Sequence, residues 1–394
     1  MSKYKELAGR INYSLFLAVV FLLPFPQFPL RYACVLWMAG WLIEGRWLQC
    51  PTPLRENKML VPFLLFGLWY AWELLSGFWA QDTSAWVAQM ERYIAFGALV
   101  PVGIWGLNDY YQPRQIIRVF VWGALAAVPF YLLTLTLCYY CPAIADRFPL
   151  CPKTPDWLSF FQENISIFKH RLFLNSVLLL AIIAVFHIWW KKWITIAAMT
   201  LPMALLIGFS GSRQSILTAV FLAFVAIMSA LPSKQRLRWG WMIGIALLLV
   251  GIAVLRIHPR MQGFNIYGES RTILWQQALE HPSDYFWTGL GAGQDRTYLH
   301  TLYDSHNQYL KELIELGVFG LLLFLSAWIS IFFCAQKKGR LPALFFVVLY
   351  ACNMCTECMF GRFCGVALWA VGLLFISIQS NRDIEQKTAR RAEA

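Results

Sequence analysis

Long apolar stretches follow one another through most of this 394-residue sequence. Each is about 20 residues long, the length that a helix needs to cross the ~30 Å hydrocarbon core of a bilayer. Backbone polar groups in lipid must find their partners within the protein, so such stretches fold as membrane-spanning helices. The stretches are continuous rather than alternating, which excludes a transmembrane β-barrel. The sequence therefore predicts an all-α polytopic integral membrane protein.

The composition agrees with this prediction, since 59% of the residues are hydrophobic and 14% are charged, against about 25% charged residues in soluble domains. We predict about 12 transmembrane helices in a single membrane domain, residues 1–394. The predicted spans are 11–30, 32–48, 59–79, 92–107, 117–138, 171–190, 193–209, 212–231, 239–256, 313–335, 341–357 and 361–379. The first span is expected to be retained, because no small-residue cleavage site follows it.

Positive charge indicates how these helices are oriented. The net charge is +12, and Lys and Arg concentrate in the cytoplasmic loops of membrane proteins. With the N-terminus inside, most Lys and Arg residues fall in short inner segments: 1–10, 46–58, 108–118, 191–192, 232–238, 336–340 and 380–391. We therefore expect both termini in the cytoplasm. The lipid bilayer explains the charge, and no nucleic acid is expected as a partner.

Two long polar loops are expected on the outer side, residues 139–170 and residues 258–312. Within the second loop, residues 270–279 have the pattern of a short helix that begins with a capping serine. The expected apolar face of this helix consists of Ile273, Leu274 and Ala278. A glycine-rich turn follows at 289–293, for which we expect either flexibility or a close approach to another segment.

The end of the second loop predicts another helix start. Ser305 and Gln308 have the spacing of a capping box, which would put His306 in the first turn of a long helix. A helix from His306 to Ala335 would be about 45 Å long at 1.5 Å per residue. Because this length exceeds the hydrocarbon core, we expect His306 near the lipid headgroups of the outer leaflet.

Four predicted helix starts on the outer side carry a cationic or ionisable side chain: Arg171, Arg213, Arg271 and His306. A helix N-terminus attracts anions, and the planar guanidinium of Arg binds phosphate oxygens in pairs. We therefore expect a phosphate site around these residues. The alternative is that the arginines are ordinary cations that reach from span ends into the interface.

His306 is the candidate general base. A helix N-terminus and nearby arginines would both disfavour the imidazolium form, so the neutral ring could accept a proton from a hydroxyl. The alternative is a packed or solvated histidine. We expect no metal, because His300 and Asp304 do not complete a set of ligands. We also expect no cofactor, because helix packing explains the cysteines within residues 352–358.

Three segments resemble the O-antigen ligases and the related O-antigen polymerases of bacterial envelopes. They are Gly211-Ser212-Arg213 at a helix start, Ser270-Arg271-x-x-x-Trp275 followed by His281-Pro282 and the glycine turn, and His306-Asn307-x-x-Leu310 leading into Glu312-x-x-Glu315-x-Gly317. The layout of many spans with a large late periplasmic loop is also similar to the ligases, over nearly the whole chain.

The resemblance implies a multi-pass glycosyltransferase of the bacterial inner membrane, with its active site in the periplasmic loop 258–312. It would move a polysaccharide from undecaprenyl pyrophosphate onto a hydroxyl of lipid A-core, with inversion and without a metal. By position, Arg213 and Arg271 would hold the pyrophosphate of the donor, and His306 would activate the acceptor hydroxyl. Further substrate contacts are expected from Arg171, Asn307, Ser212 and Trp275.

Other functions fit the same segments. A polymerase would join lipid-linked repeat units, and a protein O-oligosaccharyltransferase would use a Ser or Thr hydroxyl as acceptor. A transporter, from another functional class, would need functional charges or broken helices near mid-membrane. We instead expect Glu44, Glu73 and Glu357 near span ends, which disfavours a transporter.

Overall fold

The computed structural model describes residues 2–48, 59–141, 156–189, 192–230, 270–301, 304–335 and 341–392, with a few residues between 242 and 249. These ranges are helical and contain no strand, so the all-α prediction is confirmed for them. In chain order the helices are α1 (Ser2–Leu22), α2 (Gln27–Glu44), η1 (Arg46–Leu48), α3 (Leu60–Leu75), η2 (Ser76–Phe78), α4 (Thr83–Trp105), α5 (Pro113–Tyr140), α7 (Trp157–Phe168), α8 (Arg171–Trp189), α9 (Trp193–Phe209), α10 (Arg213–Ala230), α12 (Ser270–Glu280), η5 (Pro282–Asp284), α13 (Asp295–Tyr298), α14 (Gln308–Ala335), α15 (Leu341–Met354), η6 (Met359–Gly361) and α16 (Phe363–Ala392).

Five helical stretches in the described residues are long and apolar enough to cross a membrane. They are Leu60–Phe78, Pro113–Tyr140, Arg171–Trp189, Gln308–Ala335 and Phe363–Ser380. Two shorter apolar helices accompany them, Trp193–Phe209 and Pro342–Met354. The predicted span 239–256 lies outside the described residues except for a few positions. The number of twelve spans therefore stays a prediction.

Helix boundaries differ from the prediction where local chemistry interrupts or extends an apolar run. The predicted span 11–30 is divided, because α1 ends at Leu22 and α2 begins at Gln27 after Pro26, and proline interrupts helices. α4 begins well before the predicted residue 92. Its N-cap is Asp82, whose Oδ1 accepts the N–H of Ser84 at 2.9 Å. The predicted first outer loop also contains α7, which is too short to be recognised as a span.

Aromatic rings form the core between α3, α4, α14 and α16. The Trp369 ring lies 4.7 Å from that of Phe66 and 4.3 Å from that of Phe96, measured between centroids. Phe324 packs edge-on against Phe66 at 6.5 Å, and all four side chains are buried. Such pairs contribute about 0.5–1.5 kcal/mol each beyond the burial of their area. The core holds α14 firmly against α3 and α4.

Buried polar and charged side chains join α3, α4, α13 and α14. Lys311 donates to Gln89 Oε1 at 2.8 Å and to Glu315, and its Nζ lies 3.8 Å from Asp295 Oδ1. Gln89 donates in turn to Glu315 at 2.6 Å and to Glu73 at 3.2 Å. All five residues are buried, and none of them is more than 4% exposed. Glu73 lies in the last turn of α3, which agrees with its expected place near a span end.

α14 is interrupted at Gly317, whereas the sequence predicts one continuous long helix. Gly317 has φ 67° and ψ −171°, which breaks the helical hydrogen-bond ladder. The carbonyls of Ile314 and Glu315 accept the N–H groups of Leu290 and Gly291 instead, each at 2.9 Å. The prediction of one uninterrupted helix from His306 to Ala335 is therefore wrong, because α14 begins at Gln308 and consists of two helical segments that meet at Gly317.

The glycine-rich turn 289–293 makes a close approach to this bend, the second of the two alternatives expected for it. A Cβ atom on Gly289 would lie 2.2 Å from the carbonyl oxygen of Glu315. A Cβ on Gly317 would lie 2.2 Å from the carbonyl oxygen of Trp287. Both glycines also have positive φ, which other residues rarely adopt. Glycine is thus required on both sides of the contact.

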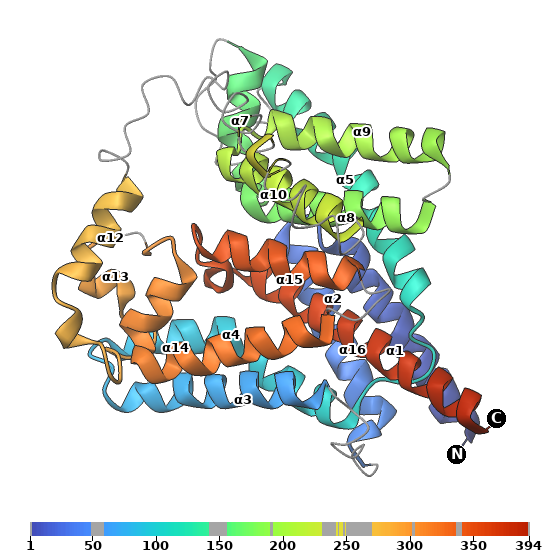
Figure 1. The fold of residues 1–394 in the computed structure, drawn as a ribbon, viewed down its shortest axis with the longest axis horizontal. Coiled ribbons are helices and arrows are strands. Elements are labelled where there is room, and N and C mark those ends of the chain that lie inside the picture. The colour runs from blue at the N-terminus through green and yellow to red at the C-terminus, as the bar shows by residue number, and fades with distance from the viewer. Residues whose placement is uncertain are drawn as a thin grey trace.

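Residues 270–301, termed the roof segment, therefore pack on the beginning of α14. Figure 1 shows α12 and α13 of this segment at one end of the bundle, with both chain termini at the opposite end. Because the bend of α14 and the roof segment share backbone hydrogen bonds, the roof is held in a defined position above the residues that precede α14.

Candidate active site

His306 lies in a turn immediately before α14. The helix begins at Gln308, and Asn307 is its N-cap, with Oδ1 accepting the N–H of Leu310 at 3.1 Å. The predicted capping box is wrong, because the hydroxyl of Ser305 donates to the carbonyl of Asn307 at 3.2 Å and does not cap the helix. His306 therefore precedes the helix and is not part of its first turn.

The turn is held in a conformation that histidine seldom adopts. His306 has φ 50°, and left-handed conformations of this kind cost about 1–3 kcal/mol. Asp304 Oδ1 accepts the N–H of His306 at 3.2 Å. The preceding residue, Ser305, is held on both backbone groups. Its N–H donates to Asp295 Oδ2 at 3.3 Å, and its carbonyl accepts Nε1–H of Trp275 at 2.7 Å. Three side chains, those of Asp304, Asp295 and Trp275, thus hold the backbone of the turn that carries the imidazole.

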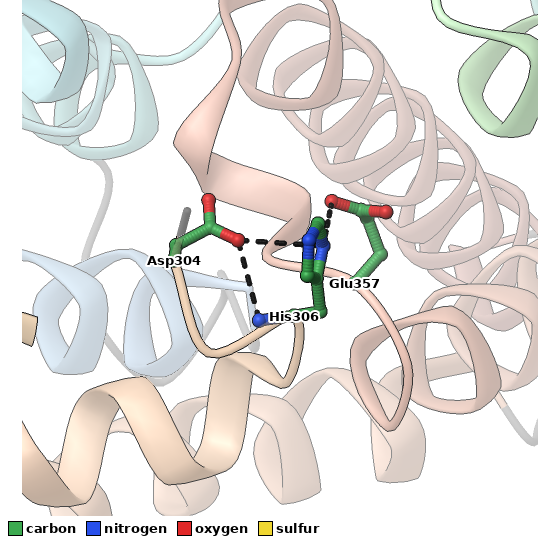
Figure 2. Close-up of side chains that lie close together, drawn as sticks. All are labelled: Asp304, His306 and Glu357. Carbon is green, nitrogen blue, oxygen red and sulfur yellow. Dashed lines mark hydrogen bonds and ion pairs between the residues drawn. The ribbon is translucent and has the colours of Figure 1, made fainter. Parts of the chain in front are cut away.

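The imidazole of His306 lies between two carboxylates (Figure 2). Its Nδ1 is 3.3 Å from Glu357 Oε1 and 3.4 Å from Asp304 Oδ1. A ring that donates Nδ1–H to a carboxylate has Nε2 as its basic nitrogen, which suits proton abstraction from a hydroxyl. The sequence had indicated arginines as the charged neighbours of the ring, and here the structure differs: the nearest charged groups are carboxylates.

Glu357, in the loop after α15, links the imidazole to an arginine. Its side chain is 4% exposed, and Oε2 lies 3.6 Å from Nη2 of Arg271. Burial alone would raise the pKa of Glu357, but the hydrogen bond with His306 and the neighbouring positive charges lower it below the ordinary value. The carboxylate is therefore ionised at neutral pH. Sequence reasoning missed this role, since Glu357 follows His306 by 51 residues.

Asp304, His306 and Glu357 also form the one set of His, Cys and acidic side chains in the described residues that could share a metal ion. Their ligand atoms lie within 4.8 Å of one another. Each carboxylate, however, already faces a guanidinium: Glu357 faces Arg271, and Asp304 faces Arg296, both at 3.6 Å. Because these cations oppose a metal, we interpret the set as an ion-paired base.

The helix α12 positions Arg271. It comprises Ser270–Glu280, so the predicted short helix is confirmed; the side chain of its first serine lies outside the described residues. Leu274 and Ala278 are buried as expected, whereas Ile273 is 44% exposed. Ile273 lies about 100° around the helix from Leu274 and therefore leaves the buried face. Arg271 and Trp275 are one turn apart, which directs both toward the His306 turn.

The starts of α8 and α10 lie beside the end of α15. Asn353 donates to Ser176 Oγ of α8 at 2.8 Å, and Gln214 of α10 donates to Asn353 Oδ1 at 3.2 Å. α8 begins at Arg171 and α10 at Arg213, as predicted. The side chain of Arg213 lies outside the described residues.

Several of these charges act on one further ring, that of His170. Burial lowers the pKa of His170 to about 4; Glu357 opposes this shift, and Arg362, Arg171 and Arg271 add to it. His170 is therefore neutral at pH 7. Two of the predicted arginines, Arg171 and Arg271, are thus close enough to act on His170, together with Glu357. Arg362 acts on the same ring, although the sequence did not indicate it.

Three residues expected to bind substrate have partners inside the protein. Trp275 bonds to the carbonyl of Ser305, and Asn307 caps α14. Ser212 is buried and accepts a hydrogen bond from the hydroxyl of Ser215 at 2.9 Å. Each of them shapes the site, and direct contact with substrate stays a prediction.

The model of a family described as O-antigen ligase matches residues 172–325. This range contains the starts of α10 and α12, the roof segment and His306, and it ends before Glu357. No curated protein matches the chain. Residues 172–325 of this chain are therefore similar to the O-antigen ligases, and this match supports a relation to the O-antigen ligase-like superfamily.

Proposed function

We propose that the protein is a glycosyltransferase that moves a polysaccharide from undecaprenyl pyrophosphate onto a hydroxyl of lipid A-core. The observation that carries this proposal is the contact of Glu357 with both His306 and Arg271. A base for the acceptor hydroxyl and a cation for the leaving phosphate are thereby neighbours. The match of the surrounding segment to the O-antigen ligases supports glycan processing.

In the proposed reaction the acceptor oxygen attacks the anomeric carbon of the donor and gives its proton to Nε2 of His306. The bond from that carbon to the pyrophosphate oxygen breaks, so the configuration inverts and undecaprenyl pyrophosphate leaves with the electron pair. Arg271, with Arg171 and Arg213, stabilises the charge that develops on the pyrophosphate. Glu357 orients the ring and stabilises the imidazolium that forms. No metal takes part.

We further propose that the site faces the periplasm and that both termini lie in the cytoplasm. The basic residues of the short loops support this orientation. The position of α12 and α13 at the end of the bundle opposite to both termini also supports it (Figure 1).

Arg271→Lys separates a phosphate-binding role from simple anchoring, because Lys keeps the charge and loses the planar fork. Losing one charge-assisted pair, about 1.5–3 kcal/mol, should lower kcat/KM by about 10–100-fold. The measurement is transfer of purified lipid-linked donor to lipid A-core in nanodiscs. The matched control is Arg31→Lys, since Arg31 is exposed and lies over the ring of Phe363. Equal activity in both variants would mean that Arg271 is an ordinary interfacial cation.

Deletion of the gene tests the reaction itself in the cell. We expect bare lipid A-core together with accumulated long lipid-linked chains, visible on lipopolysaccharide gels. Core that carries single repeat units would instead identify a polymerase. Unchanged lipopolysaccharide with under-glycosylated periplasmic proteins would identify a protein acceptor.

A further inference from the structure

A polar cleft of about 740 Å³ lies in the roof segment, and none of its lining residues belongs to the His306 site. Its walls come from the last turn of α12, from η5, from α13 and the residues after it, and from Gln81 before α4. The volume falls within the range of about 300–1,000 Å³ that small-molecule sites occupy.

The cleft and the active site share two helices. On α12, Arg271 faces the active site, whereas Gln277 and Glu280 line the cleft. On α13, Arg296 reaches Asp304 of the active site, whereas Tyr298 lines the cleft. A ligand in the cleft would therefore contact the same two short helices that carry Arg271 and Arg296 of the active site.

Charge distinguishes the two places. Among the described residues, those lining the cleft include the carboxylates of Glu280 and Asp284 and neither Lys nor Arg. Near the active site, in contrast, three arginines act on the ring of His170: Arg362, Arg171 and Arg271. A pyrophosphate would be repelled by the cleft and attracted to the active site. The cleft therefore suits a ligand without negative charge.

The lining has the chemistry that recognises sugar hydroxyls. The amide of Gln277 can donate and accept, and the carboxylate of Glu280 accepts, which matches hydroxyls that do both. Tyr298 adds an aromatic surface for the C–H face of a sugar ring. Its own ring is held by Tyr285, edge-on at 5.4 Å, and its hydroxyl donates to the carbonyl of His281 at 3.3 Å.

A metal site is a poorer interpretation of the cleft. Its acidic and histidine side chains do not converge, since the one set close enough to share a metal in the described part of the chain is Asp304, His306 and Glu357.

We propose that this cleft binds a short uncharged oligosaccharide segment of one of the two substrates. The proposal rests on the proposed function and adds to it a site that selects the glycan. The segment belongs either to the acceptor core or to the donor polysaccharide, and the chemistry of recognition is the same for both.

The test is the double variant Gln277→Ala, Glu280→Ala, assayed with each substrate varied in turn. Both side chains are exposed, so the fold and the melting temperature should be kept. Loss of two hydrogen bonds, about 1 kcal/mol each, should raise KM for one substrate about tenfold or more, with kcat within about twofold. An increase for the acceptor assigns the cleft to the core, and an increase for the donor assigns it to the polysaccharide.

The matched control is Gln276→Ala, an exposed position of α12 outside the cleft, which should leave both KM values unchanged. Two unchanged KM values in the double variant, or a fall in kcat alone, would overturn the proposal. If the wild type transfers no glycan, the proposed function fails, but the cleft can still be tested by itself. Titration calorimetry then measures whether the protein binds core oligosaccharide or polysaccharide freed of lipid. If the wild type binds one of these glycans and the double variant does not, the oligosaccharide site is supported. If the wild type binds neither, the proposal is refuted.

Discussion

Replacing His306 with alanine is expected to lower turnover by about 10²–10⁴-fold, the contribution of a positioned general base. The reason is the geometry of the ring, whose Nδ1 lies 3.3 Å from Glu357 and 3.4 Å from Asp304 and leaves Nε2 as the basic nitrogen. Transfer between purified donor and acceptor in nanodiscs measures the effect. Protein abundance and donor binding should be largely kept, because the ring is at the surface of the turn and 25% exposed.

The variant His306→Gln distinguishes a base from a residue that only positions substrate. Glutamine keeps hydrogen-bonding groups but cannot take up the proton, so it should lose nearly as much turnover as alanine. The matched control is His187→Ala, at an exposed position in the last turn of α8, which should turn over normally. If His306→Gln turns over normally, His306 is not the general base. Asp304 would then be the next candidate for that role.

Lys311→Met is expected to destabilise the protein by about 3–5 kcal/mol, the cost of removing one partner from a buried ion pair. Lys311 is 4% exposed and bonds to Gln89 and Glu315. Without it, the carboxylates of Glu315 and Asp295 lose their common cation in a buried place. Denaturant titration of the purified protein, followed by tryptophan fluorescence, measures the free energy of unfolding. Activity should fall as well, since Asp295 holds the backbone of the His306 turn.

A second substitution checks that charge is the cause. Adding Glu315→Gln to Lys311→Met removes the unpaired carboxylate and keeps its hydrogen-bonding shape, so a large part of the lost stability should return. Lys5→Met, at an exposed position of α1, is the control and should change little. If Lys311→Met unfolds at the wild-type denaturant concentration, the buried pair contributes no net stability.

Much of the architecture could be predicted because its signals are local. Each apolar run by itself indicates a helix, because in lipid the backbone N–H and C=O groups can form hydrogen bonds only within the protein. The starts of α8 at Arg171 and of α10 at Arg213, and the short helix that carries Arg271, followed from neighbouring residues alone. The same local pattern identified His306 as the candidate base, though its assumed place inside the helix was wrong.

The remaining features depend on contacts between distant segments. Glu357 reaches His306 only because α15 and α14 pack together, and no spacing rule connects residues 51 positions apart. The bend at Gly317 exists because the turn 289–293 supplies the N–H groups that its free carbonyls need. Sequence alone thus predicted the all-α class of the described residues and the helix starts at Ser270, Arg171 and Arg213. Tertiary structure decided which carboxylates hold the imidazole, because hydrogen bonds and charge pairs form between helices whose packing no local pattern specifies.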